Sequence, residues 1–204
     1  MIPDPDPQWF LRINGLARDT PWLHPVITGY ADYGIVVFVA LLLAGWWIAR
    51  RRCDLTVLAP AVWAPLGVLA AVAINQPIVA VFAEPRPYAM LPHILVLAHR
   101  SSDPSFPSDH AMFAGAAAAG LWLVNRWLGT LAVLAAVAMA FARVYIGAHY
   151  THDVLVGLGL GVTVSVLGFS VMRPILVRLL ARAEHSRLRP LLIAAAEPAE
   201  LPIR

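Results

Sequence analysis

Residues 106–124 read FPSDHAMFAGAAAAGLWLV, a short polar cluster followed by a long apolar run. Pro107 has no backbone N–H and Ser108 is a favoured N-cap, so we predict that a helix begins here. The run after His110 contains no Asp, Glu, Lys or Arg and suits a lipid environment. The pattern therefore places a hydroxyl, a carboxylate and an imidazole at the N-terminal end of an apolar helix.

The composition of the chain is that of a membrane protein. Of its 204 residues, 60% are hydrophobic and 13% are charged, and the mean hydropathy is +0.71. Soluble domains are about 25% charged, so a soluble enzyme is disfavoured. The net charge of +3 is small, and we expect no nucleic-acid partner. We predict an all-α fold, a polytopic membrane helical bundle that forms a single domain over residues 1–204.

Five segments are predicted to span the bilayer, because a spanning helix needs about 20 mainly apolar residues. They are 33–49, 55–82, 110–124, 128–142 and 154–172. In the last of these, Gly157, Gly159 and Gly161 suggest close packing against another helix. Apolar and polar side chains mix over residues 9–30, which favours an N-terminal interfacial amphipathic helix over a sixth span.

Arginines mark one side of the predicted bundle, and the chain contains no lysine. Basic residues favour the cytoplasmic side of a membrane. The arginines at 50–52 follow the first span, and Arg126 lies between the third and the fourth. The fifth span is followed by Arg173, Arg178, Arg182, Arg187 and Arg189. Alternating spans put all three groups inside, with a cytoplasmic tail over about 174–204. The loop 83–109 and the segment 143–153 then lie on the extracytoplasmic face of a multi-pass cell-membrane protein.

The segment RVYIGAHYTHD at 143–153 combines groups that suit nucleophilic catalysis. His149 and Asp153 are four residues apart and would share one face of a helix. The carboxylate can hold one ring nitrogen of His149 and leave the other free to attack. A turn at Gly147 can bring Arg143 back toward the same point.

Two further polar segments, EPRP at 84–87 and SFPSDH at 105–110, fall on the same predicted face. The helix N-terminus after Ser108 is a ready anion site, to which the hydroxyl adds a donor. Arg86 offers a planar guanidinium suited to phosphate oxygens, and His110 can hold a proton for a leaving group. The groups together predict an anion pocket, and the phosphate of a membrane lipid is the anion that suits the bilayer surface best.

A metal site is the competing interpretation of HYTHD, because two histidines three residues apart and an aspartate suit zinc. The two arginines would repel a cation, so we predict no metal. His152 is interpreted as a structural or supporting group rather than a catalytic one. Glu84 either pairs with Arg86 or is solvated, and both alternatives remain open at this point.

These residues resemble the three-part signature of the type-2 phosphatidic-acid phosphatase superfamily. That signature combines a Lys–Arg–Pro segment, a Pro-Ser-Gly-His segment and an Arg…His…Asp segment. The corresponding residues here lie within 84–153: Arg86 and Pro87, then 107–110, then Arg143, His149 and Asp153. Within the superfamily, SFPSDHA and RVYIGAHYTHD are similar to bacterial undecaprenyl-pyrophosphate phosphatases of the bacitracin-resistance type.

The resemblance implies catalysis without a metal or an organic cofactor. His149 would attack phosphorus and become a phosphohistidine, Asp153 would orient it, and His110 would protonate the leaving oxygen. The phosphate would be bound by Arg86, Ser108 and Arg143, with Asp109 in the same pocket. The expected reaction converts undecaprenyl pyrophosphate to the monophosphate, a cell-wall lipid carrier. The alternatives are a phosphatase of phosphatidic acid or phosphatidylglycerol phosphate, a non-catalytic lipid binder or transporter, and a vanadate-dependent haloperoxidase.

The chain departs from the family pattern at two positions. Val79 stands where the family has its lysine, and Arg100 or His99 is expected to supply the missing cation. Asp109 replaces the family glycine, and its carboxylate should repel phosphate unless it is turned away or paired. Arg100 and Arg143 are the expected partners for Asp109.

Overall fold

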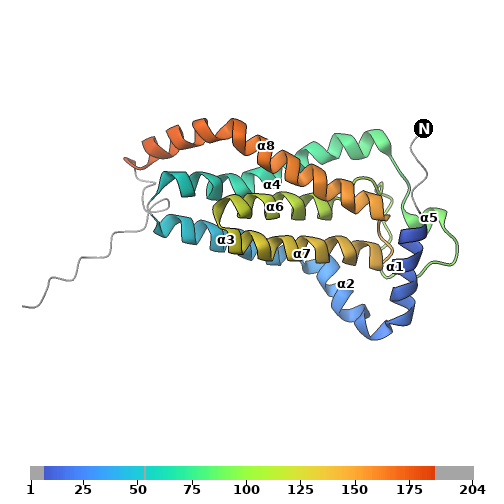
Figure 1. The fold of residues 1–204 in the computed structure, drawn as a ribbon. Helices are drawn as coiled ribbons and strands as arrows, with labels where there is room; N and C mark the ends of the chain where they lie inside the picture. The colour runs from blue at the N-terminus through green and yellow to red at the C-terminus, as the bar shows by residue number, and fades with distance from the viewer. Residues whose placement is uncertain (1–6, 53, 187–204) are drawn as a thin grey trace, which may run out of the picture.

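Five long helices run side by side in the computed structural model, which describes residues 7–52 and 54–186 (Figure 1). They are α3 (Ile35–Arg51), α4 (Leu55–Phe82), α6 (Asp109–Val124), α7 (Arg126–Tyr145) and α8 (Thr151–Ala183). α4, α6, α7 and α8 each contain a predicted span, whereas α3 begins two residues after the start of the predicted span 33–49. The described residues include no strand. The all-α bundle predicted from the sequence is therefore confirmed.

The helices differ in their ability to cross a membrane. Among the described residues, three stretches are long and apolar enough alone: Leu55–Met90, Arg126–Tyr145 and Thr151–Ala183. A fourth crossing results if Pro21–Tyr33 and Ile35–Arg51, which are bent by 53°, act as one span. α6 has only 16 residues, about 24 Å at 1.5 Å per residue, and is surrounded by α4, α7 and α8. The third predicted span is therefore a short central helix.

α6 and α8 approach each other closely because glycines line their contact. A Cβ at Gly157 would lie 2.8 Å from the carbonyl oxygen of Ser108, and one at Gly161 would overlap the carbonyl oxygen of Met112. On the α6 side, a Cβ at Gly115 would collide with the backbone of Leu158. Gly159 faces open space, so the predicted packing role holds for two of the three glycines in α8.

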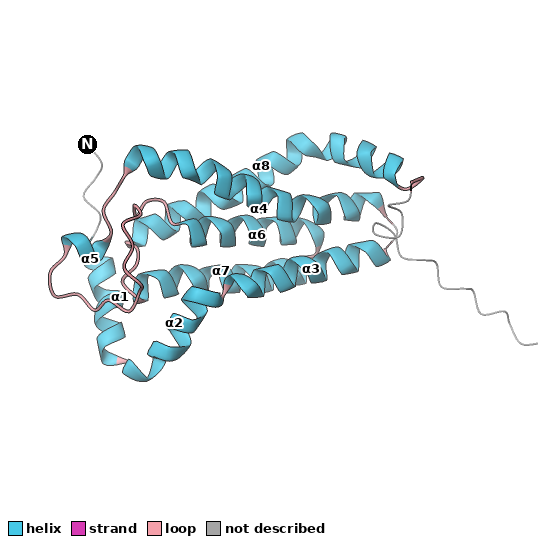
Figure 2. Ribbon diagram, turned by 180° about the vertical axis from the view of Figure 1, so that it is seen from behind, coloured by secondary structure: helices cyan, strands magenta, loops and turns pink. Residues whose placement is uncertain are grey.

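The N-terminal region corrects one prediction, because residues 9–30 do not form a single interfacial helix. The chain forms α1 (Pro7–Asp19), a 3-10 turn (Pro21–Leu23) and α2 (His24–Tyr33). Pro21 and Pro25 lack the N–H that a continuous helix needs, so the chain changes direction between them. Figure 2 shows α2 leading into α3, with α1 and the loops gathered at one end of the bundle.

The loop after the short helix α5 (Pro87–Met90) is tied to both α1 and the α7–α8 turn. Asn14 of α1 is buried, and its side-chain amide both donates to and accepts from the main chain of Leu95, at 2.7 and 2.9 Å. The main-chain N–H groups of Leu97 and Ala98 donate to the carbonyl of Ile146. These bonds fix the loop over the end of the bundle where the polar segments meet.

The ends of the chain match the sequence expectations only in part. α8 continues through Pro174 to Ala183, so the described start of the predicted tail is helical. The remainder of that tail, residues 187–204, lies outside the described residues.

Replacing Gly161 with alanine should loosen the α6–α8 contact. The added methyl group meets main-chain atoms that cannot move without shifting α6, so we expect a loss of about 1–3 kcal/mol and a lower Tm in detergent. Gly159→Ala is the matched control in the same helix and should be neutral or slightly stabilising, because helix propensity improves. Equal Tm values for the two variants would contradict the assigned contact.

Candidate active site

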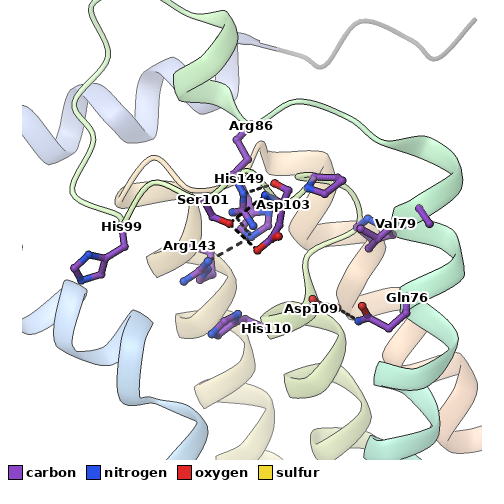
Figure 3. Close-up of a pocket in the computed structure, with 13 residues that line it drawn as sticks. Gln76, Val79, Arg86, His99, Ser101, Asp103, Asp109, His110, Arg143 and His149 are labelled. Atoms are coloured by element: carbon purple, nitrogen blue, oxygen red, sulfur yellow. Dashed lines mark hydrogen bonds between the residues drawn. The ribbon is translucent and has the colours of Figure 1, made fainter.

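The three polar segments meet at one end of the bundle, around a cavity of about 620 Å³ (Figure 3). Five predicted site residues line it: Arg86, Asp109, His110, Arg143 and His149. The other two, Ser108 and Asp153, are fully buried behind its wall. The expected convergence of residues that are distant in the sequence is therefore present.

Arg86 is oriented by main-chain carbonyls. Its Nε donates to the carbonyl of Asp103 at 2.9 Å, and its Nη1 donates to the carbonyl of Ala148 at 3.1 Å. The same Nη1 lies 3.3 Å from Nε2 of His149, and Figure 3 labels both residues at the centre of the site. The guanidinium therefore has a fixed orientation beside the imidazole.

His149 is held in one tautomer by the backbone. Its Nδ1 lies 2.8 Å from the carbonyl oxygen of Ser105, which can only accept, so Nδ1 carries the hydrogen. Nε2 then has a free lone pair, which faces Nη1 of Arg86 and, at 3.5 Å, Nη2 of Arg143. This nitrogen is thus turned toward two guanidinium groups on the cavity wall.

Asp153 supports this imidazole less directly than the spacing predicted. Its Oδ2 is 3.4 Å from Nδ1 of His149, farther than the Ser105 carbonyl. Oδ2 also accepts from the Ser105 hydroxyl and, at 2.9 Å, from the main-chain N–H of Tyr150. Sequence reasoning missed Ser105, although it opens the SFPSDH segment. It contacts both members of the His–Asp pair.

Arg143 reaches the site from the last turn of α7. Gly147 adopts a φ of 77°, a left-handed conformation that glycine accepts without strain, and the turn brings Arg143 back to His149 as predicted. Nε of Arg143 is buried and finds no hydrogen-bond partner among the described residues. An anion in the cavity could satisfy this donor.

Ser108 has the predicted N-cap role. Its hydroxyl accepts from the N–H of Ala111 at 3.5 Å, and its own N–H donates to the carbonyl of Asp153 at 3.2 Å. The side chain is buried and does not line the cavity, so its hydroxyl serves the helix. The cavity wall at the start of α6 is formed instead by Pro107, Asp109 and His110.

Asp109 corrects a second prediction, because it pairs with neither Arg100 nor Arg143. Its Oδ1 accepts from the side-chain amide of Asn75 at 2.6 Å. It also accepts from the amide of Gln76 at 3.2 Å, a contact drawn in Figure 3. Both amides come from α4, where they interrupt an otherwise apolar run. Two polar residues in an apolar run indicated a polar contact. The partner of that contact, Asp109, is visible only in the structure.

Val79, which stands where the family has its lysine, lines the cavity. Of the two proposed replacements, His99 lines the cavity, with its ring turned away from the Arg86–His149 centre in Figure 3. Arg100 does not line it, and its guanidinium lies over the ring of Tyr88, 5.5 Å from the centroid. Arg100 is therefore not the replacement cation.

Glu84 follows neither alternative considered from the sequence. It is buried, and its Oε2 lies 3.3 Å from Nε2 of His152, which in turn lies 3.0 Å from Oδ1 of Asp153. The three side-chain atoms lie within 4.8 Å of one another, close enough for a cation to bridge them. Nε2 of His152 makes a hydrogen bond to Glu84, whereas its 3.0 Å contact with Oδ1 of Asp153 is an ion-pair distance, because that oxygen has no hydrogen-bond partner among the described residues.

Burial lowers the pKa of His149, because the charged imidazolium loses its hydration. The carboxylate of Asp153 opposes this shift, and the guanidinium groups of Arg143 and Arg86 add to it. The imidazole is therefore neutral at neutral pH, with the Nε2 lone pair available. This protonation state is the one that a nitrogen nucleophile needs.

The comparison with known families agrees with this arrangement. Residues 60–175, more than half of the chain, match the family model described as the PAP2 superfamily. The chain belongs to the PAP2 superfamily. This is the type-2 phosphatidic-acid phosphatase superfamily that the three polar segments resemble, and its membership makes the protein a phosphatase.

One sequence relative and two solved structures show which members of the PAP2 superfamily this chain is similar to. It is 31% identical over 169 residues to undecaprenyl-diphosphatase BcrC of Bacillus subtilis (strain 168), with 81% of this chain and 84% of that protein covered. The crystal structure of Aquifex aeolicus LpxE is similar, with a TM-score of 0.62, 23% identity, and 78% and 94% of the two chains covered. A PAP2-type phosphatidylglycerolphosphate phosphatase from B. subtilis gives a TM-score of 0.60, 21% identity, and 92% and 91% coverage. The protein is a membrane lipid phosphatase with the fold of these structures.

The imidazole of His149 should titrate below pH 6.5, the ordinary midpoint of histidine. NMR of selectively labelled histidine in detergent, assigned with His149→Gln, would measure this midpoint. Asp153→Asn should lower it further, because the carboxylate favours the protonated ring. A midpoint at or above 6.5, or an upward shift in the variant, would contradict the account of the site.

Proposed function

We propose that this PAP2 phosphatase hydrolyses undecaprenyl pyrophosphate to undecaprenyl phosphate on the extracytoplasmic face, through a phosphohistidine on His149. The observation that carries the proposal is the position of His149 Nε2, which faces Arg86 and Arg143 at 3.3 and 3.5 Å. A phosphate held by both guanidinium groups would place its phosphorus in front of that nitrogen. The undecaprenyl substrate class is supported by the relative BcrC, whose name describes it as an undecaprenyl-diphosphatase.

The first step transfers the terminal phosphoryl group to the protein. The Nε2 lone pair forms a bond to phosphorus while the bridging P–O bond breaks, and the bond electrons stay on the lipid monophosphate. His110, on the wall of the same cavity, donates a proton to the leaving oxygen. The new positive charge on the His149 ring is stabilised by the Asp153 carboxylate 3.4 Å from Nδ1.

The second step releases inorganic phosphate. Water attacks the phosphohistidine, His110 accepts a proton from that water, and the P–N bond breaks to restore the neutral imidazole. Arg86 and Arg143 neutralise charge on the equatorial oxygens in both steps, so they act on the transition state rather than on one intermediate. Over the two steps, one water molecule hydrolyses the P–O–P linkage and yields the lipid monophosphate and inorganic phosphate.

The extracytoplasmic placement is supported by the distribution of arginines around the bundle. Arg50 and Arg51 end α3, Arg126 begins α7, and Arg182 lies in the last turn of α8. These positions lie at the end opposite the cavity, as the labelled helices in Figure 1 allow the reader to follow. Because arginines favour the cytoplasmic side of a membrane, we infer that the cavity lies at the extracytoplasmic end of the bundle.

A panel of lipids tests the proposed substrate. Purified protein in detergent should release phosphate from undecaprenyl pyrophosphate with a higher kcat/KM than from phosphatidic acid or phosphatidylglycerol phosphate. The reason is the leaving group, since a phosphate monoester leaves more easily than an alkoxide. A preference for either phospholipid would replace the proposed substrate and keep the reaction type.

Replacing His149 with alanine should abolish turnover, because no phosphoenzyme can then form. Brief incubation of the wild type with terminally labelled substrate, followed by quenching, should trap an acid-labile phosphoprotein that the variant lacks. His185→Phe, in the turn after α8 and far from the cavity, is the control for protein folding and handling. Full activity of His149→Ala would indicate a lipid binder or a different nucleophile.

A further inference from the structure

A second imidazole lies behind the site, and the proposed chemistry does not use it. Nε2 of His152 is 3.0 Å from Oδ1 of Asp153 and 3.3 Å from Oε2 of Glu84. The other oxygen of Asp153 faces His149 and Ser105. Asp153 is therefore held between two histidines, one on the cavity and one behind it.

The ring of His152 contacts two aromatic side chains. It stacks on Tyr150 with a centroid distance of 5.6 Å and an interplanar angle of 17°. Phe106 lies at the same centroid distance with an angle of 31°. Aromatic faces attract cations, so this position favours the charged imidazolium. Nε2 of this ring makes its hydrogen bond to Glu84 and lies at an ion-pair distance from Oδ1 of Asp153.

The two carboxylates need a positive partner. Asp153 is fully buried and Glu84 is 8% exposed, and their oxygens near His152 lie within 4.8 Å of each other. Two buried carboxylates at this distance cannot both remain ionised unless a cation lies between them. The charged and titratable groups that face His152 are Glu84 from the segment after α4, Asp153 from α8, and Tyr150 from the α7–α8 turn.

We propose that His152, paired with Glu84, is a positioning residue that keeps Asp153 ionised and turned toward His149. The inference rests on the proposed function, because it assigns the effect to the attack by His149. If His152 could not supply a positive charge, a proton would settle on one of the two carboxylates. An Asp153 that carried it would no longer stabilise the cationic ring formed when Nε2 bonds to phosphorus.

His152→Phe separates this role from packing, because phenylalanine keeps the aromatic stack and removes only the charge and the N–H donor. We expect kcat to fall by about 10–100-fold, as is typical for the partner that orients a catalytic group. KM should stay within about twofold, since the guanidinium groups are untouched. Glu84→Gln alone should have a small effect, because His152 still faces an ionised Asp153.

The decisive variant is the double replacement Glu84→Gln with His152→Phe. Removing the second carboxylate relieves the repulsion, so the double variant should be several-fold more active than His152→Phe alone. A double variant no more active than the single one would overturn the proposal and leave a packing role. A stoichiometric divalent metal in the wild type, absent from His152→Phe and required for activity, would overturn it in favour of a metal centre.

The NMR midpoint of His149 distinguishes failure of this inference from failure of the proposed function. It should fall in His152→Phe, because Asp153 then shares a proton with Glu84 and carries less negative charge, and return toward the wild-type value in the double variant. This measurement needs no substrate. Absence of phosphate release from undecaprenyl pyrophosphate by the wild type would reject the proposed substrate. An unchanged His149 midpoint in both variants would instead reject the role proposed for His152 and Glu84.

Discussion

The close approach of the first turns of α6 and α8 is the constraint on which the site depends. The N–H of Ser108 donates to the carbonyl of Asp153, and Gly157 lies directly against the carbonyl of Ser108. This contact places the segment that orients His149 beside the segment that carries it. A side chain larger than hydrogen at Gly157 or Gly161 would separate the two helix ends. Small residues deep in the apolar core therefore act on the geometry of the polar site.

The sequence predicted the bundle and the three polar segments because both depend on local pattern. Apolar length identified the helices, and residue type together with spacing identified the groups at Arg86, His110 and His149. The supporting contacts were harder to foresee, since the atoms that hold His149 and Arg86 are main-chain carbonyls, which every residue has. Glu84 and His152 are far apart in the chain, so only the fold shows that they meet. The broken helix over residues 9–30 was visible in its prolines, but the amphipathic pattern outweighed them.

The charge balance of the cavity follows from how its acidic groups are bound. The Asp109 carboxylate is held by two neutral amides, and no carboxylate is paired with Arg86 or Arg143 among the described residues. Both guanidinium groups therefore remain available for an anion. Glu84 and Asp153 are compensated by His152 on the far side of the wall. Asp103 and Asp109 line the same cavity as the two guanidinium groups, but neither carboxylate forms an ion pair with them among the described residues.

The short length of α6 has a consequence for the membrane around the protein. A helix of about 24 Å does not cover a hydrocarbon layer about 30 Å thick, whereas its neighbours α4 and α8 extend well beyond it. At the cavity end, α4 continues past the first turn of α6, because Asn75 already contacts Asp109 and α4 ends only at Phe82. Val79 and Ala80 from this extension of α4 line the cavity beside the N-terminus of α6. A lipid bound as proposed would hold its phosphate in this cavity and leave its chains in the surrounding bilayer.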